Sequence, residues 1–132
     1  IEVICVSYEK KGIESLNVAI LCYKDSNYNS CVNRYYYSFY QDLMNKLTSK
    51  GISINEQNLS GGSHEKAFNQ FIDKVLRPIK RPNPKVVMNL RTKYGDFKNL
   101  RVLADYKPEL LSKDDVDEAI RLYNELSKEI NI

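Results

Sequence analysis

Tryptophan is absent from this sequence of 132 residues, histidine occurs once, and cysteine occurs only three times. Cys5, Cys22 and Cys31 are odd in number and lack the spacing of metal ligands, which favours small core residues in a reducing compartment. The sequence also has no Gly-rich phosphate loop and no nucleophile triad. We therefore expect neither a bound metal nor a cofactor.

The sequence also lacks a long apolar run, since no stretch approaches the roughly 18 residues that suggest a membrane-spanning helix. Its first residues are IEVICVSYEKK, in which the apolar stretch is too short for a secretory signal and charged residues follow it too early. With 42% hydrophobic and 28% charged residues, the composition is that of an ordinary globular protein. We expect a single domain over residues 1–132, cytoplasmic and without membrane contact.

Acidic residues are missing from one stretch and concentrated in another, although the net charge is only +3. Between Lys74 and Lys93 there are seven basic residues and no acidic one, whereas seven acids lie between Glu109 and Glu129. Such a distribution can mark an anion-binding face. Basic residues at solvated helix ends are the alternative explanation. Under the first interpretation, the predicted nucleic-acid-binding residues are Arg77, Lys80, Arg81 and Lys85.

The strongest helical pattern is found over residues 27–50, NYNSCVNRYYYSFYQDLMNKLTSK, and Gly51 is expected to end this helix. Apolar residues recur there at spacings of three and four, which places them on one buried stripe: Val32, Tyr36, Phe39, Leu43 and Leu47. Asn33 and Arg34 fall close to the same stripe. Their polar groups must therefore find a partner or a ligand at the edge of the core.

Four further helices are predicted, over about 8–24, 63–77, 85–106 and 113–130, with a loop over 52–62. The first should bury an apolar stripe and approach its neighbour closely at Gly12; the stripe is Ile13, Leu16, Ile20 and Tyr23, with Ala19 alongside. Four residues are candidate N-caps: Asp25 or Asn27, Ser63 and Ser112. Prolines should exclude a helix over 77–84: Pro78, Pro82 and Pro84.

Short connections and the absence of a strand pattern predict the fold class. Neighbouring helices joined by short links lie antiparallel in bundles. We therefore expect an all-α protein, an antiparallel up-and-down bundle of four to five helices.

Three stretches of the sequence, in order, resemble the HEPN domain family. YNSCVNRYYYSFYQDL is similar to that family's second-helix signature, SHEKAFNQF to the opening of its third helix, and LRVLADY to an Arg, three residues, Asp-Tyr pattern before the last helix. Members are small helical bundles found with nucleotidyltransferases, in toxin-antitoxin loci and in phage defence systems. The resemblance implies an HEPN-like bundle that forms a homodimer with a polar cleft at the interface.

In members that cleave RNA, the resemblance implies an Arg followed four to six residues later by a His, acting without metal. The motif places its Arg on Arg101, while the window for the His holds Tyr106, Lys107 and Pro108. A guanidinium can stabilise the charge that develops on a phosphate, but a phenol with an ordinary pKa near 10 is a poor base at neutral pH. The predicted catalytic residues are accordingly Arg101 and Tyr106, with metal-independent ribonuclease activity depending on them.

The predicted substrate-binding residues are Asn33, Arg34, His64 and Asp105. Each also has a structural explanation. Asp105 lies one helical turn from Arg101 and can simply form an ion pair with it. His64 can serve as a structural hydrogen-bonding group in the first turn of its helix, and the tyrosines of 27–50 can belong to the core rather than to a base-stacking surface.

Two functional hypotheses follow from the sequence. The first is an HEPN-like protein of a bacterial or archaeal defence or toxin-antitoxin system that binds RNA or a nucleotide in a dimer-interface cleft. The second is a non-catalytic protein-binding module whose partner is a nucleotidyltransferase or an antitoxin. An unrelated helical bundle is the remaining alternative.

Overall fold

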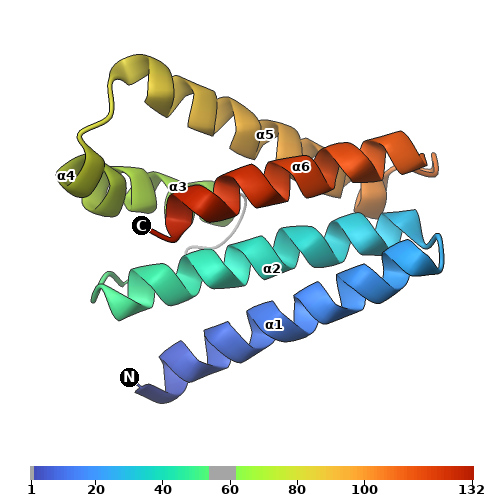
Figure 1. Cartoon of the computed structure of the whole chain (residues 1–132), viewed down its shortest axis with the longest axis horizontal. Coiled ribbons are helices and arrows are strands. Elements are labelled where there is room, and N and C mark those ends of the chain that lie inside the picture. The colour runs from blue at the N-terminus through green and yellow to red at the C-terminus, as the bar shows by residue number, and fades with distance from the viewer. Residues whose placement is uncertain (1, 54–61) are drawn as a thin grey trace.

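The computed structural model describes residues 2–53 and 62–132, and in this part of the chain the protein is all-helical. Its elements are α1 (Glu2–Lys24), α2 (Tyr28–Ser49), α3 (Ser63–Phe71), the π-helical turn η2 (Ile72–Leu76), α4 (Arg77–Lys80), α5 (Pro84–Tyr106) and α6 (Lys113–Ile130). Because α3, η2 and α4 follow one another without a break, the described residues form five helical segments. The predicted all-α bundle is confirmed (Figure 1). Most of the predicted loop 52–62 lies outside the described residues.

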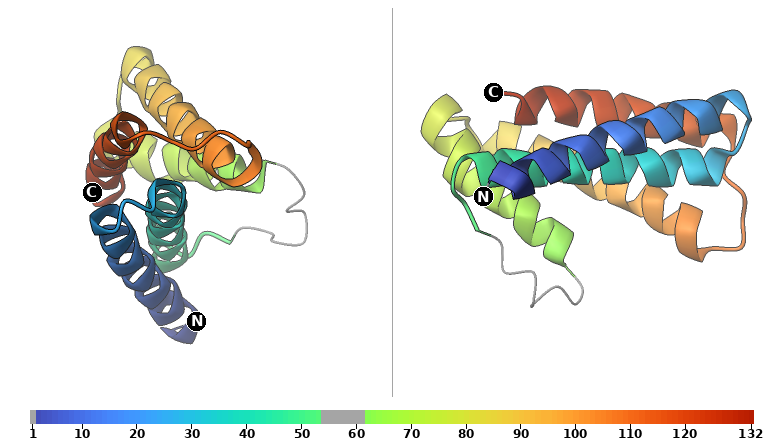
Figure 2. Two further views of the ribbon diagram at one scale, coloured as in Figure 1. Left: turned by 90° about the vertical axis from the view of Figure 1, so that its right-hand side faces the viewer. Right: turned by 90° about the horizontal axis from the view of Figure 1, so that it is seen from below.

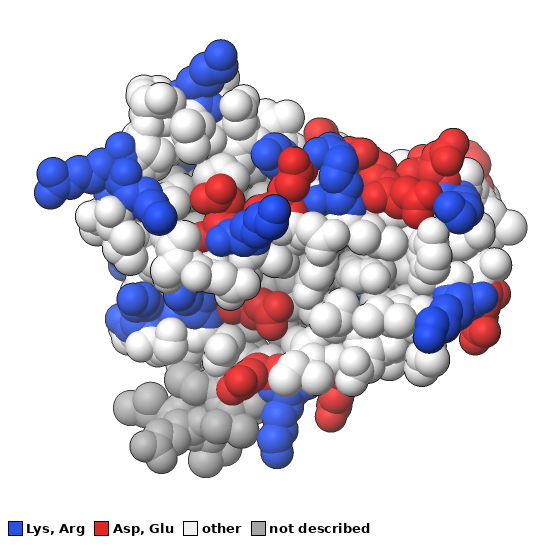
Figure 3. Space-filling view, in the orientation of Figure 1, with Lys and Arg blue, Asp and Glu red and all other residues white. Residues whose placement is uncertain are grey.

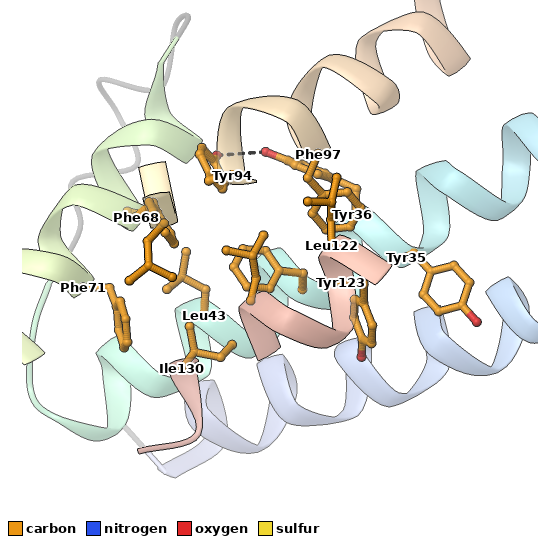
Figure 4. Close-up of a cluster of buried hydrophobic side chains, with 14 of the residues drawn as sticks. Tyr35, Tyr36, Leu43, Phe68, Phe71, Tyr94, Phe97, Leu122, Tyr123 and Ile130 are labelled. Atoms are coloured by element: carbon orange, nitrogen blue, oxygen red, sulfur yellow. Dashed lines mark hydrogen bonds between the residues drawn. The ribbon is translucent and has the colours of Figure 1, made fainter. Parts of the chain in front are cut away.

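Helix α2 lies at the centre of the bundle and packs against α1, α3, α5 and α6 (Figure 2). All five residues of its predicted stripe have no exposed surface: Val32, Tyr36, Phe39, Leu43 and Leu47. Gly51 has a φ of 74°, a left-handed conformation that suits glycine directly after a helix. Figure 4 shows aromatic and aliphatic side chains from α3, α5 and α6 gathered around this stripe. The prediction for α2 is therefore confirmed.

Helix α1 packs on the core through only part of the predicted stripe: Leu16 and Tyr23 are partly buried against it and Ala19 is fully buried, as predicted. Ile13 and Ile20 are 54% and 40% exposed, whereas Ser15 is 7% and Ala19 is 0% exposed. At Gly12 an added Cβ would lie 2.3 Å from an oxygen of the Asp42 carboxyl group, so the predicted close approach is present. The small residues allow α1 to lie close to α2, and this packing leaves the larger apolar side chains outside. Asn27 takes the N-cap position of α2 but makes no side-chain capping bond.

The segment from α3 to α4 corrects two predictions. Gly62, with a φ of 92°, rather than Ser63 holds the N-cap position of α3. Helix α4 includes Pro78, although a proline was expected to exclude a helix here. Pro78 lacks an amide proton and would clash with a carbonyl in an uninterrupted α-helix, but η2 widens the preceding turn and Pro78 lies in the first turn of α4.

Helices α5 and α6 begin at clearly formed caps. The Asn83 side chain accepts a hydrogen bond from the amide of Val86 (3.0 Å), and Pro84 occupies the first turn of α5. At α6, Ser112 Oγ accepts from the amide of Asp115 (3.2 Å), and the Asp115 carboxylate accepts from the amide of Ser112 (2.9 Å). This reciprocal pair is a capping box, and it confirms Ser112 as the predicted N-cap of α6.

Charge is distributed unevenly on the folded molecule. Figure 3 shows basic side chains at the end of the molecule that carries α4 and acidic side chains along α6. Most of the two charge-rich stretches therefore lie in different regions of the surface, and they meet where Lys93 pairs with Glu125 at 3.8 Å. Among the described residues, no helix is long and apolar enough to cross a membrane.

Candidate functional site

Two arginines from different helices meet at one tyrosine ring. The guanidinium carbon of Arg34, on α2, lies 5.5 Å from the centroid of Tyr37, and that of Arg101, on α5, lies 5.9 Å from the same centroid. The two positive charges thus share a region although 67 residues separate them in the sequence. Together with Asn33, Asp105 and Tyr106, these residues form what we call the arginine cluster.

Arg101 is the most enclosed charged group of the cluster, with 8% of its surface exposed. Its guanidinium carbon lies 5.0 Å from the ring centroid of Tyr36 and 5.9 Å from that of Tyr106. Burial alone would lower the pKa of Arg101, but Tyr37, Tyr36 and Asp105 more than compensate, so the pKa is raised and the charge is retained. Its Nε is buried without a hydrogen-bond partner among the described residues.

A chain of polar contacts connects the two arginines. Arg34 donates from Nε and Nη2 to the side-chain oxygen of Asn33, at 2.8 and 2.5 Å. Asn33 Nδ2 in turn donates to both carboxylate oxygens of Asp105, at 3.0 and 3.1 Å. Asp105 forms an ion pair with Arg101 at 3.6 Å. Because Asn33 donates at one end and accepts at the other, the contacts define the orientation of its amide group.

A surface hollow of about 480 Å³ lies beside this chain of contacts. It is formed by the facing parts of α1, α2 and the end of α5, and its lining residues are Val18, Cys22, Asn29, Ser30, Asn33, Arg34, Ala104 and Asp105. Only Arg34 carries a positive charge in this lining. Among the described residues, no group of three or more His, Cys, Asp or Glu side chains is placed to hold a metal ion.

Asn29 is a site residue that the sequence analysis missed. Its Nδ2 donates to the carbonyl of Ala104 (3.2 Å), and its Oδ1 accepts from the amide of Leu111 (2.9 Å). Asn29 therefore fixes the end of α5 and the segment that follows it against the start of α2. An asparagine in the motif YNSCVNR was visible in the sequence, but only the fold shows that it bridges segments 75 and 82 residues away.

His64, at the start of α3, lies beside the cluster and within the aromatic core. Its Nδ1 is 2.9 Å from the hydroxyl of Tyr36, and its ring stacks on Tyr40 with centroids 4.0 Å apart. Burial, the nearby Arg101 and Lys98 lower its pKa to about 4. His64 is therefore neutral near pH 7 and contributes hydrogen-bonding capacity rather than positive charge.

The Tyr36 hydroxyl that contacts His64 also contacts the Tyr94 hydroxyl at 3.0 Å (Figure 4). Burial is the main reason that the pKa of Tyr36 rises to about 12 and that the pKa of Tyr94 is raised. These phenols remain protonated and link α2, α3 and α5. Tyr106 differs from them because 72% of its surface is exposed, next to the guanidinium of Arg101.

The four basic residues predicted to bind nucleic acid do not join the arginine cluster. Arg77 and Lys80 lie on α4, Arg81 follows α4, and Lys85 lies in the first turn of α5. All four are exposed. Lys85 and Arg101 are 16 residues apart on α5, which corresponds to about 24 Å at the rise of an α-helix. The basic end and the arginine cluster are therefore two separate positive regions of one molecule.

Comparison with known proteins does not assign the chain to a family. No family model matches it, and no curated protein or solved structure is significantly similar to it.

Proposed function

We propose that this chain is an HEPN-like protein that binds RNA or a nucleotide by placing a phosphate group at the arginine cluster. The observation that carries the proposal is the combination of charge, burial and incomplete hydrogen bonding at Arg101. Its guanidinium is charged, nine-tenths buried, supported by aromatic rings and incompletely hydrogen-bonded. A buried guanidinium normally has its donors satisfied, so the unused Nε donor of Arg101 favours an anionic ligand.

A phosphate group fits the chemistry of this arrangement. A guanidinium offers several donors in a planar fork that matches the oxygens of a phosphate group. Arg34 supplies a second positive charge near the same Tyr37 ring. The exposed ring of Tyr106 offers a surface on which a base can stack, a contact typically worth about 1–3 kcal/mol.

Binding is better supported than cleavage. A guanidinium such as that of Arg101 stabilises charge on a phosphate, but a ribonuclease also needs a base and an acid that exchange protons near neutral pH. The pKa of His64 is about 4, and its Nδ1 already contacts the Tyr36 hydroxyl. We therefore propose RNA or nucleotide binding as the principal activity, with any metal-independent cleavage depending on Arg101 and Tyr106.

The proposal includes a homodimer and a defence or toxin-antitoxin setting, both of which derive from the resemblance to HEPN domains. A dimer that places two arginine clusters along one cleft would lengthen the RNA that the protein contacts. Light scattering coupled to size-exclusion chromatography tests the dimer directly. A monomer at micromolar concentration would contradict this part of the proposal.

The test of binding uses a fluorescein-labelled single-stranded RNA and fluorescence anisotropy with the wild type and Arg101→Ala. We expect Arg101→Ala to weaken binding about tenfold or more, since charged hydrogen bonds contribute about 1.5–3 kcal/mol. Arg121→Ala is the matched control, because Arg121 is an exposed arginine of the acidic helix α6. Equal affinities of all three proteins, or no binding at all, would refute the proposal. Incubation of the RNA with EDTA present measures any metal-independent cleavage.

The alternative function, a protein-binding module, is favoured by a different observation. Helix α1 exposes apolar side chains at Ile13, Ile20 and Leu21, which are 54%, 40% and 59% exposed. Exposed apolar residues gathered on one helix are typical of surfaces that contact another protein. Co-purification of a nucleotidyltransferase with the wild type but not with Ile13→Asp/Ile20→Asp would support this alternative. Retention of the partner by the double variant would argue against α1 as its contact surface.

A further inference from the structure

We propose that Asp105 occupies the place of the ligand's anion in the free protein, so that a phosphate group reaches Arg101 by displacing the Asp105 carboxylate. This inference rests on the proposed function, because it concerns how the same site is kept closed. It gives Asp105 a specific role: its carboxylate limits the affinity for phosphate instead of contributing to it.

The first argument is the length of the contact between Asp105 and Arg101. Charge-assisted hydrogen bonds between a guanidinium and a carboxylate typically measure about 2.7–2.9 Å. The Asp105–Arg101 ion pair measures 3.6 Å, and the Nε of Arg101 has no partner. The carboxylate therefore balances the charge of Arg101 without using its capacity for short hydrogen bonds. A phosphate oxygen that approached more closely would make a stronger contact.

The second argument concerns what holds the carboxylate in place. Both oxygens of Asp105 accept from Asn33 Nδ2, at 3.0 and 3.1 Å, so its short hydrogen bonds are to a neutral amide. Its side chain remains 23% exposed, and it borders the hollow of about 480 Å³. A rotation of this one side chain into that hollow would move the carboxylate away from the Arg101 guanidinium without moving the helices.

The third argument concerns the energetics of exchange. Asp105 lies one helical turn from Arg101, and their ion pair, at 3.6 Å, is longer and therefore weaker than a short charge-assisted hydrogen bond. A weak internal partner can be displaced by an anion with more charge and more oxygens. The same carboxylate, if it remained nearby, would repel that anion. Asp105 therefore favours ligands whose phosphate carries enough charge and contacts to outcompete it.

The test compares Asp105→Asn with the wild type, using anisotropy of the labelled single-stranded RNA. Asparagine keeps the shape and an acceptor for Asn33 but removes the charge. Removing one repulsive charge at about 4 Å in a water-exposed site corresponds to roughly a fivefold gain in affinity. Asp96→Asn is the matched control, because Asp96 is an exposed acid on the same helix. We expect it to change the affinity less than twofold.

A double variant tests whether the gain acts through Arg101. If Asp105 competes for that guanidinium, Arg101→Ala/Asp105→Asn should bind no more tightly than Arg101→Ala. Competition by inorganic phosphate and by AMP shows whether the phosphate group alone or a nucleotide is sufficient. Asp105→Ser serves as a second variant, and a thermal melt of each protein confirms that it is folded.

The outcomes separate this inference from the proposed function. Tighter binding by Asp105→Asn that disappears without Arg101 supports both. RNA binding by the wild type that requires Arg101 but is unchanged or weaker in Asp105→Asn and Asp105→Ser overturns the inference alone. An equal gain from Asp96→Asn also overturns it, because the effect would then be general electrostatics. No binding by any variant overturns the proposed function and this inference together.

Discussion

The carboxyl group of Asp42 provides a sharp test of how α1 and α2 pack. It lies on α2 against Gly12 of α1, where an added Cβ would come within 2.3 Å of its oxygen. Burial, and secondarily the negative charge of Glu9, raise its pKa from 3.8 to about 6. Asp42 therefore loses its proton at a higher pH in the folded protein than in the unfolded chain, where it ionises at its ordinary pKa.

The sign of the effect on stability follows from proton binding. Between pH 3.8 and about 6 the folded state binds more protons at Asp42 than the unfolded state. Its contribution to the free energy of unfolding is thus largest below pH 3.8 and is lost as the pH rises through about 6. The full shift corresponds to about 3 kcal/mol at 1.36 kcal/mol per pKa unit. Because the carboxyl group is partly accessible to solvent, screening reduces our expectation to about 1 kcal/mol.

Asp42→Asn removes this ionisation with little change in shape. We expect it to be more stable than the wild type by about 1 kcal/mol at pH 7 and equally stable near pH 4. Urea unfolding followed by circular dichroism across this range measures the difference, in which the other titrating groups largely cancel. Asp96→Asn, at an exposed position, should show no such pH-dependent difference. An equal difference in the free energy of unfolding between Asp42→Asn and the wild type at both pH values, or no difference at pH 7, would refute the reasoning.

Two further predictions concern hydrogen bonds that fix the helices. Ser112→Ala removes one half of the capping box of α6 and should lower the free energy of unfolding by about 1 kcal/mol, measured by urea unfolding; an unchanged midpoint would contradict it. Tyr36→Phe removes the hydroxyl shared by His64 and Tyr94 and should cost about 2 kcal/mol, against about 1 kcal/mol for Tyr94→Phe, which leaves the bond to His64 intact. The reverse order of stability in thermal melts would show that the shared hydroxyl is not the central group.

The success of sequence reasoning differed between helices for a physical reason. In α2, large apolar residues form the buried stripe, so their periodicity identified the core correctly. In α1, the same rule selected Ile13 and Ile20, which are exposed. Close helix packing there selects small residues, and Ala19 with Ser15 gives only a weak signal in a search for large apolar side chains. The helix at Pro78 was missed because a π-helical turn depends on the packing of its buried residues, which local proline rules do not include.

From the residues alone, without the resemblance, the candidate site was predictable only where its contacts are local. The pairing of Arg101 with Asp105 follows from their spacing on one helix, and the structure contains it at 3.6 Å. The meeting of Arg34 with Arg101 depended on α2 and α5 being neighbours, which the resemblance suggested and composition could not. The contact of His64 with Tyr36 required the position of α3, and nothing near His64 in the sequence indicated it.

Tyr36 connects the stability of the fold with the candidate site, and the two roles use different parts of the side chain. Its ring, with no exposed surface, packs against Phe97 and lies 5.0 Å from the guanidinium carbon of Arg101. Its hydroxyl contacts His64 and Tyr94 instead. Because a cation–π contact needs the ring and not the hydroxyl, Tyr36→Phe should lower stability while preserving the support of Arg101. Loss of stability without loss of RNA affinity in that variant would therefore show that the hydroxyl network stabilises the core and is not needed for RNA binding.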